Sequence, residues 1–222
     1  MGQWLNLTAD DGVRLAAYRA DATAQPRGGL IVVQEIFGVN GHIRAVCEGF
    51  AADGYVAIAP ALFDRYERNV DIGYTAEEVA RGRALKARAS TDAALRDIAA
   101  AREAVATAGR VGVVGYCWGG FIAWMSAARV PGLGCAITYY GGGMPDAIAE
   151  QPRCPVSAHF GERDTAIPLP GVKQFAAAHR EVEVHLYPAE HGFNCDQRGS
   201  YDPASAQLAR QRTIAFLRQH VG

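Results

Sequence analysis

Residues 111–120, VGVVGYCWGG, are the stretch that decides the fold. The first four residues are the short, mostly β-branched run that is typical of a buried strand, and the apolar, alanine-rich residues that follow predict a helix. Between them, Gly115, Cys117 and Gly119 have the spacing of a nucleophile elbow, a tight turn in which small residues flank an exposed nucleophile. This stretch therefore predicts a strand leading directly into a helix, with Cys117 as the candidate nucleophile between them.

Further apolar runs of strand length predict a mostly parallel sheet around this strand. Unbroken runs of this kind are typical of strands that are buried on both faces. They cover residues 30–33, 55–58, 135–139, 155–160 and 182–187. Near the N-terminus, residues 4–7 and 13–18 flank the turn sequence Asp-Asp-Gly, which predicts a β-hairpin and brings the number of strands to eight.

Segments with apolar residues at helical spacing separate these strands. They cover approximately residues 42–52, 76–87, 91–106, 119–128, 171–179 and 204–217. Thr91 is expected to cap the third helix and Pro203 to open the last one. Because strands and helices alternate almost throughout, we expect a single α/β domain over residues 1–222, with helices on both faces of the sheet. The irregular stretch 63–75 is expected to border the functional site.

Composition excludes several classes of function. Lys and Arg (22) nearly balance Asp and Glu (23), so the net charge of −1 gives no electrostatic drive toward nucleic acid. The apolar runs stop far short of the roughly 20 residues that span a bilayer. Five cysteines without close spacing, and an N-terminus without a signal-peptide pattern, favour a reducing cytoplasm. We expect a cytoplasmic monomer that binds neither nucleic acid nor membranes, since no heptad seam indicates a protein partner.

An acid and a histidine follow the candidate nucleophile in the order that this kind of turn requires. Asp164 follows the strand at 155–160, and His191 follows the strand at 182–187. His191 would take the thiol proton of Cys117, and Asp164 would hold the imidazole tautomer. Each residue alone has an ordinary alternative, namely a buried structural cysteine, a helix cap or surface charge, and a turn histidine. Their order and placement together favour a catalytic triad.

The strand at 30–33 ends in the segment QEIFG, residues 34–38, at the same expected edge of the sheet. Glu35 emerges there from a buried strand, where a carboxylate also has the ordinary roles of cap or ion-pair partner. The backbone N–H of Ile36 and that of Trp118 hold the positions expected of an oxyanion hole.

No pattern in the sequence indicates a metal or a cofactor. It contains no H-E-x-x-H motif and no closely spaced Cys/His cluster, and the glycines at 132 and 134 lack the third glycine of a dinucleotide fingerprint. The histidines other than His191 lie within expected strands or helices and are interpreted as structural. We therefore expect the chemistry to use protein groups alone.

Four features together resemble the dienelactone hydrolase family of α/β-hydrolases. They are QEIFGVN at 34–40, VVGYCWGG at 113–120, Asp164, and HGF at 191–193, and the resemblance covers nearly the whole chain. It implies an α/β-hydrolase fold and hydrolysis of a lactone or small ester through an acyl-thioester on Cys117. It also implies that Glu35 is functional and pairs with this cysteine. The competing hypothesis is a non-catalytic protein that binds a small ligand or senses oxidants through Cys117.

The resemblance also bears on substrate recognition. Family members that act on dienelactone bind its carboxylate through one arginine before the elbow helix and another four residues past the histidine. Cys195 occupies that second position here, with Arg198 three residues later. Arg81 is the predicted first arginine, although Arg83 could also serve and Arg81 could instead pair with Glu77 on its own helix. Phe37, in the QEIFG segment, is likewise expected to contact the substrate.

Overall fold

The computed structural model describes residues 2–222, and an eight-stranded sheet forms the centre of this part of the chain. In spatial order the strands are β1 (Gln3–Thr8), β2 (Arg14–Ala20), β4 (Tyr55–Pro60), β3 (Gly28–Val33), β5 (Val111–Tyr116), β6 (Leu133–Tyr139), β7 (Val156–Gly161) and β8 (Glu183–Tyr187). β1 and β2 form the predicted antiparallel hairpin, β2 joins β4 antiparallel, and the remaining pairs are parallel. The predicted eight-stranded, mostly parallel sheet is confirmed.

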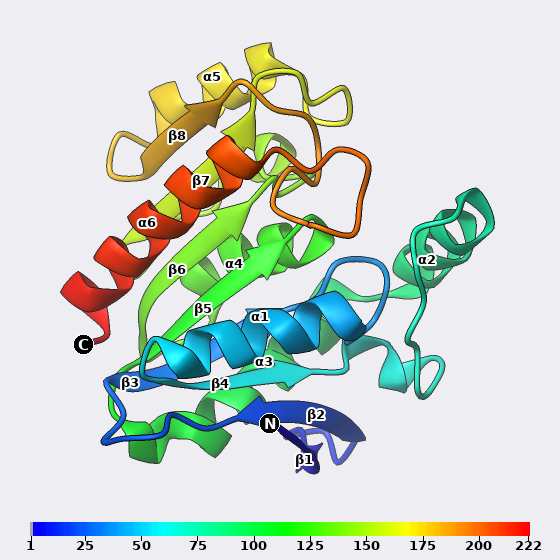
Figure 1. Ribbon diagram of the computed structural model, residues 1–222, viewed down its shortest axis with the longest axis vertical. Helices are drawn as coiled ribbons and strands as arrows, with labels where there is room; N and C mark the ends of the chain where they lie inside the picture. The colour runs from blue at the N-terminus through cyan, green and yellow to red at the C-terminus, as the bar shows by residue number, and fades with distance from the viewer. Residues whose placement is uncertain (1) are drawn as a thin grey trace.

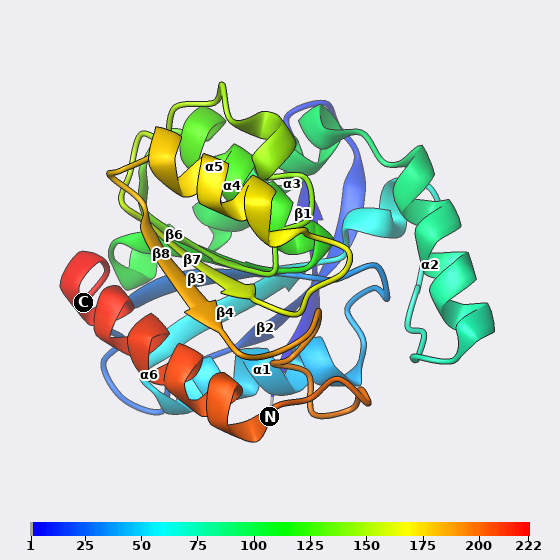
Figure 2. The ribbon, with the colours of Figure 1, turned by 90° about the horizontal axis from the view of Figure 1, so that it is seen from above.

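Helices cover both faces of the sheet, as predicted. One face is covered by α1 (Gly41–Ala52) and α6 (Pro203–His220), and the other by α3 (Thr91–Val105), α4 (Trp118–Arg129) and α5 (Leu169–Ala178), as Figure 2 shows. The remaining helix, α2 (Ala76–Arg88), stands apart from both layers in Figures 1 and 2. Short 3₁₀ turns complete the structure at Leu62–Arg65, Ala106–Ala108 and Pro145–Ala147.

Burial explains why the strands could be recognised. Every residue of β3, β4, β5 and β7 is buried, because helices pack on both sides of these central strands. The edge strand β8 is only partly buried, and its sequence EVHLY mixes polar and apolar residues accordingly. Within residues 2–222, no helix combines the length and the apolar character needed to cross a membrane.

The helix ends show one correct and one wrong prediction. Pro203 opens α6 as expected, behind the cap Asp202, whose side chain accepts a hydrogen bond from Ser205 N. The cap of α3 is Ser90 and not Thr91, because Ser90 has the extended backbone and its side chain accepts from Ala93 N. Thr91 is already helical.

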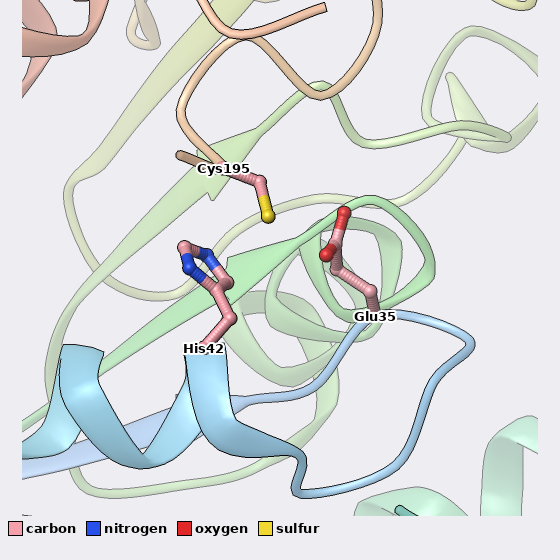
Figure 3. Close-up of side chains that lie close together, drawn as sticks. All are labelled: Glu35, His42 and Cys195. Carbon is pink, nitrogen blue, oxygen red and sulfur yellow. The ribbon is translucent and has the colours of Figure 1, made fainter. Parts of the chain in front are cut away.

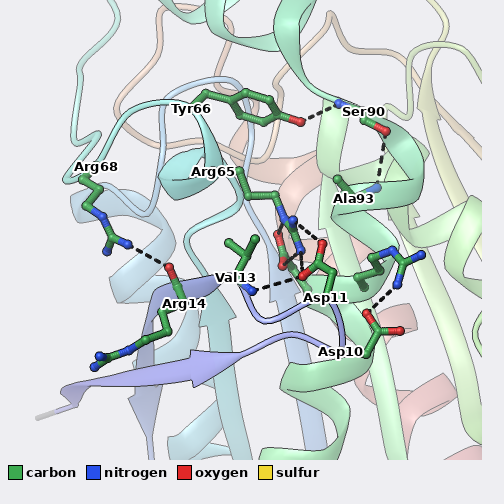
Figure 4. A network of polar contacts seen from close by, with 11 residues as sticks. Asp10, Asp11, Val13, Arg14, Arg65, Tyr66, Arg68, Ser90 and Ala93 are labelled. Carbon is green, nitrogen blue, oxygen red and sulfur yellow. Dashed lines mark hydrogen bonds and ion pairs between the residues drawn. The ribbon is translucent and has the colours of Figure 1, made fainter.

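Ion pairs fix the irregular stretch between β4 and α2. Arg65 forms hydrogen-bonded ion pairs with Asp97 of α3 and with Asp11 in the hairpin turn (Figure 4). The side chains of Arg65 and Asp97 are 8% and 0% exposed, so this pair lies inside the protein. Nearby, the ring of Phe63 stacks on that of Trp118 at 5.1 Å. The stretch 63–75 therefore borders the elbow residues, as expected.

Candidate active site

The elbow at Cys117 is formed by very close backbone contacts. Cys117 joins β5 to α4 with φ 55° and ψ −117°, a left-handed conformation that strains a residue with a side chain. A Cβ at Gly115 would lie 1.9 Å from the carbonyl oxygen of Gly119, and one at Gly119 would lie 2.4 Å from that of Gln34. Only glycine fits at both positions, which explains why the motif predicted this turn.

The three residues of the predicted triad lie in one hydrogen-bonded chain. His191 Nε2 is 3.1 Å from Cys117 Sγ, and His191 Nδ1 is 2.7 Å from Asp164 Oδ2. The other oxygen of Asp164 accepts from the backbone N–H of Ala166 and that of Ile167, at 2.8 and 3.0 Å. The carboxylate is therefore held on both oxygens and directed at the imidazole.

The surroundings of His191 favour its protonated form. Burial lowers the pKa of His191, but the hydrogen bonds with Asp164 and Cys117 outweigh burial and raise this pKa above its usual range. An imidazolium formed by accepting the thiol proton is thus stabilised by the adjacent carboxylate. By contrast, burial raises the pKa of Cys154 and that of Cys195 to about 11, so these thiols stay protonated at neutral pH.

A cavity of about 380 Å³ opens in front of the triad and contains both predicted oxyanion residues. Its walls include Cys117 and His191, the two predicted oxyanion residues and Phe37, together with a glycine-containing segment and three basic side chains. They are Ile36, Phe37, Val79, Arg83, Lys86, Cys117, Trp118, Gly142, Gly143, Asp146, Ala166, His191 and Arg198. Trp118 is the first residue of α4, so its N–H has no carbonyl partner within the helix.

Glu35 contacts an arginine in this structure. Its Oε1 accepts a hydrogen bond from Arg198 Nη1 at 3.1 Å, and Glu35 itself is 1% exposed. The resemblance implied a pairing of Glu35 with Cys117, whereas the thiol here contacts His191. The guanidinium of Arg198 also lies 5.7 Å from the ring of Phe37 and reaches the cavity wall. Arg198 lies three residues past the position where the family pattern predicts the second arginine. In the structure it is the arginine that contacts this carboxylate.

The structure does not bring Arg81 into the cavity. Arg81 forms an ion pair with Glu67, not with Glu77, and its side chain is 52% exposed. The helix face that lines the cavity carries Val79, Arg83 and Lys86, which are spaced four and three residues apart on one side of α2. Arg81 falls outside this row, so of Arg81 and Arg83 it is Arg83 that lines the cavity.

Helix α2 reaches the oxyanion loop through a glycine. Gly82 is buried in α2, and a Cβ at this position would lie 2.4 Å from the carbonyl oxygen of Ile36. The neighbouring Arg83 lines the cavity. The spacing of Val79, Arg83 and Lys86 places these side chains on one face of the helix. This spacing is the sequence signal for the basic side of the cavity.

The chain is similar to known proteins in sequence and fold over most of its length. Residues 15–221 match the model of the "Dienelactone hydrolase family". A candidate carboxymethylenebutenolidase from Synechocystis sp. is 36% identical, over 91% of each chain. The crystal structure of a candidate dienelactone hydrolase from Klebsiella pneumoniae is 30% identical and superposes with a TM-score of 0.84 over 99% of each chain.

A more distant structure shows the same fold. The dienelactone hydrolase-like promiscuous phosphotriesterase P91 from metagenomic libraries is 20% identical, with a TM-score of 0.81 over 100% of this chain and 99% of its own. An identity of 20% supports the fold alone. The family model, and the relatives at 30% identity or more, show that the sequence is similar as well. The chain therefore belongs to the dienelactone hydrolase family of ester and lactone hydrolases, as its motifs predicted.

Proposed function

We propose that the protein hydrolyses lactones or small esters through a Cys117–His191–Asp164 triad and an acyl-thioester intermediate. The observation that supports this most strongly is the hydrogen-bonded chain from Cys117 Sγ through His191 to Asp164, which ends in a cavity large enough for a small substrate. A thiolate is the reactive form of cysteine, and a histidine held by a carboxylate is the base that generates it.

The proposed reaction has two halves. His191 Nε2 takes the thiol proton, the sulfur attacks the carbonyl carbon, and the backbone N–H groups of Ile36 and Trp118 stabilise the oxyanion. Collapse of this intermediate breaks the carbonyl–oxygen bond, and His191 returns the proton to the leaving oxygen, which in a lactone stays attached to the acyl group. Water, deprotonated by His191, then attacks the thioester and releases the acid.

The proposal predicts sustained turnover of an activated aryl ester. The wild-type protein should release many equivalents of the phenol per active site, and Cys117→Ala should release none above the buffer rate, because the attacking atom is lost. Continuous absorbance of the released phenol measures both. A single stoichiometric burst, or turnover retained in Cys117→Ala, would instead support the alternative of a ligand binder or thiol sensor.

The basic wall of the cavity favours a substrate that carries a carboxylate. Among the residues that line the cavity, Arg198, Arg83 and Lys86 are basic, and Asp146 is the acidic one. Burial lowers the pKa of Arg198, but Glu35 and the other groups around it together outweigh burial and raise this pKa, so the guanidinium stays charged. A charge-assisted hydrogen bond from Arg198 to the substrate would contribute about 1.5–3 kcal/mol.

Arg198→Ala is therefore expected to raise KM for a carboxylate-bearing lactone by roughly ten- to a hundredfold, at about 1.4 kcal/mol per decade. The methyl ester of the same lactone should be affected far less, because it lacks the charge. Arg81→Ala is the matched control, since Arg81 pairs with Glu67 at the surface. Steady-state kinetics on both substrates decide the matter; equal losses on the acid and its methyl ester would contradict this role of Arg198.

We further propose that the protein acts on its small-molecule substrate as a cytoplasmic monomer. The cysteines at 47, 117, 135, 154 and 195 are all free within the described chain, as a reducing compartment requires. The hydrolysis as proposed uses the triad and water and needs no cofactor.

A further inference from the structure

Behind the catalytic cavity, three side chains from distant parts of the sequence converge. Glu35 follows β3, His42 lies in the first turn of α1, and Cys195 lies in the loop between β8 and α6 (Figure 3). One donor atom from each lies within 4.8 Å of the other two. The three residues are 1%, 5% and 0% exposed, so the cluster is inside the protein.

Two polar atoms of this cluster lack a partner. Within residues 2–222, neither Glu35 Oε2 nor His42 Nε2 has a hydrogen-bond partner, and both are buried. The other atom of each group is already engaged: Glu35 Oε1 accepts from Arg198, and His42 Nδ1 lies 3.4 Å from Asp196 Oδ1. A buried polar atom without a hydrogen-bond partner is unfavourable, so two at one place indicate a missing ligand.

The donor set identifies the class of ligand. A cysteine sulfur, an imidazole nitrogen and a carboxylate oxygen are the three ligand types that Zn²⁺ binds in proteins. From this convergence of Glu35, His42 and Cys195 around two unpartnered atoms, we infer a binding site for Zn²⁺ or a metal of similar preference. Binding releases the thiol proton of Cys195 to solvent, and the thiolate, Glu35 and Asp196 then balance the charges of the ion and of Arg198. Water would complete a tetrahedral site.

The geometry needs only a small adjustment. Tetrahedral bonds of about 2.0–2.3 Å place ligand atoms roughly 3.3–3.8 Å apart, so side-chain rotations that draw the donors together by roughly an ångström suffice. Asp196, behind the far nitrogen of His42, is positioned as the carboxylate that commonly orients a metal-bound histidine. It favours the tautomer with the proton on Nδ1, which leaves the Nε2 lone pair free for the metal.

One residue of the cluster, His42, also borders a second cavity. A second cavity, of about 350 Å³, lies between α1 and α6 and is lined by His42, Tyr116, Asp196 and Arg210 among others. It shares no lining residue with the cavity in front of the triad. A metal ion could therefore reach His42 without passing the nucleophile.

Metal binding here would connect two segments of the active site. Cys195 belongs to the loop that also carries His191 and Arg198, and Glu35 directly precedes the oxyanion residue Ile36. A shared ion would tie these two segments together and stabilise the folded protein, since a ligand of the native state alone shifts the unfolding equilibrium. This inference does not rest on the proposed hydrolysis, because metal binding is measured without substrate.

The test must separate this site from the catalytic thiol and imidazole, which could also bind Zn²⁺. We therefore take Cys117→Ala as the parent protein and add Zn²⁺ after exhaustive treatment with a chelator. Metal content after gel filtration, and the thiolate-to-metal charge-transfer absorption of the Co²⁺ form, are measured. The same measurements are made with Cys195→Ser, with His42→Ala, and with Cys154→Ala as the control for a cysteine outside the cluster, each added to Cys117→Ala.

The expected result is one Zn²⁺ per chain and a charge-transfer band in Cys117→Ala and in the Cys154 control. Cys195→Ser should lose the band, and both cluster variants should weaken Zn²⁺ binding at least tenfold. Zn²⁺ at a hundredfold excess over Kd should raise Tm of the parent by about 5–10 °C, and should fail to do so in the cluster variants. Retention of less than one equivalent by Cys117→Ala, as for a cluster that holds only water, or binding unchanged by both cluster variants, would overturn the inference.

Discussion

His191→Ala is expected to lower kcat/KM for an activated ester by on the order of 10⁴-fold. Within residues 2–222, the imidazole of His191 is the hydrogen-bond partner of Cys117 Sγ, at 3.1 Å. Without this imidazole, no base is in place to accept the thiol proton. Asp164→Asn should lower the rate by a similar factor, because an amide cannot stabilise the imidazolium and allows the wrong tautomer. Initial rates with one activated ester measure both effects.

A second histidine provides the matched control. His185 lies on β8, partly exposed, next to Glu183 and away from the catalytic cavity. His185→Ala should therefore retain nearly the parental rate. Circular dichroism should show that both histidine variants fold, since the effect on the rate is attributed to chemistry alone. If His191→Ala hydrolysed the ester at the parental rate, the triad would be the wrong interpretation of this geometry.

Arg65→Ala is expected to reduce the free energy of unfolding by about 3–5 kcal/mol, the usual cost of removing one partner from a buried ion pair. Asp97 is fully buried and accepts two hydrogen bonds from Arg65, at 2.9 and 2.8 Å. Burial raises the pKa of Asp97 even with Arg65 present, which shows how costly this carboxylate is to bury. Urea unfolding at neutral pH measures the change.

Two further variants distinguish the contribution of the buried ion pair to stability from that of an exposed one. Arg65→Met combined with Asp97→Leu should recover most of the lost stability, because no unpaired charge then remains inside. Arg96→Ala removes an exposed arginine that pairs with Asp10 in the same network and should change stability little. If Arg65→Ala were as stable as Arg96→Ala, the ion pair of Arg65 with Asp97 would not stabilise the network drawn in Figure 4.

The sheet could be predicted from the sequence because its central strands are buried on both faces. In β3 and β5 every position is apolar or glycine, and no helical spacing competes with that pattern. The elbow could also be predicted from the sequence, because only glycine fits at positions 115 and 119. Cys117 followed from the glycine spacing of the elbow, and Asp164 and His191 followed from their places after two later strands, because the loops after parallel strands meet at one edge of the sheet.

Long-range side-chain partners could not be predicted in the same way. Arg81 and Arg83 are equivalent in the sequence, and only the packing of α2 in the folded chain shows that Arg83 lines the cavity. Glu35 was expected beside Cys117, but its partner Arg198 lies 163 residues away and depends on how the loop before α6 folds.

Contacts between distant loops also explain why no sequence pattern indicated a metal site. Glu35, His42 and Cys195 follow no ligand spacing, and only the folded loops bring them together.

The central claim, that Cys117 carries the acyl group during hydrolysis, is tested most directly by trapping the intermediate. The protein is mixed with an activated ester, quenched in acid within the first turnover, digested and analysed by mass spectrometry. The account predicts an acyl mass on the peptide that contains Cys117, forming and decaying at rates that match turnover. Turnover without an acyl group on that peptide, or with the acyl group on another residue that forms and decays at the turnover rate, would contradict it.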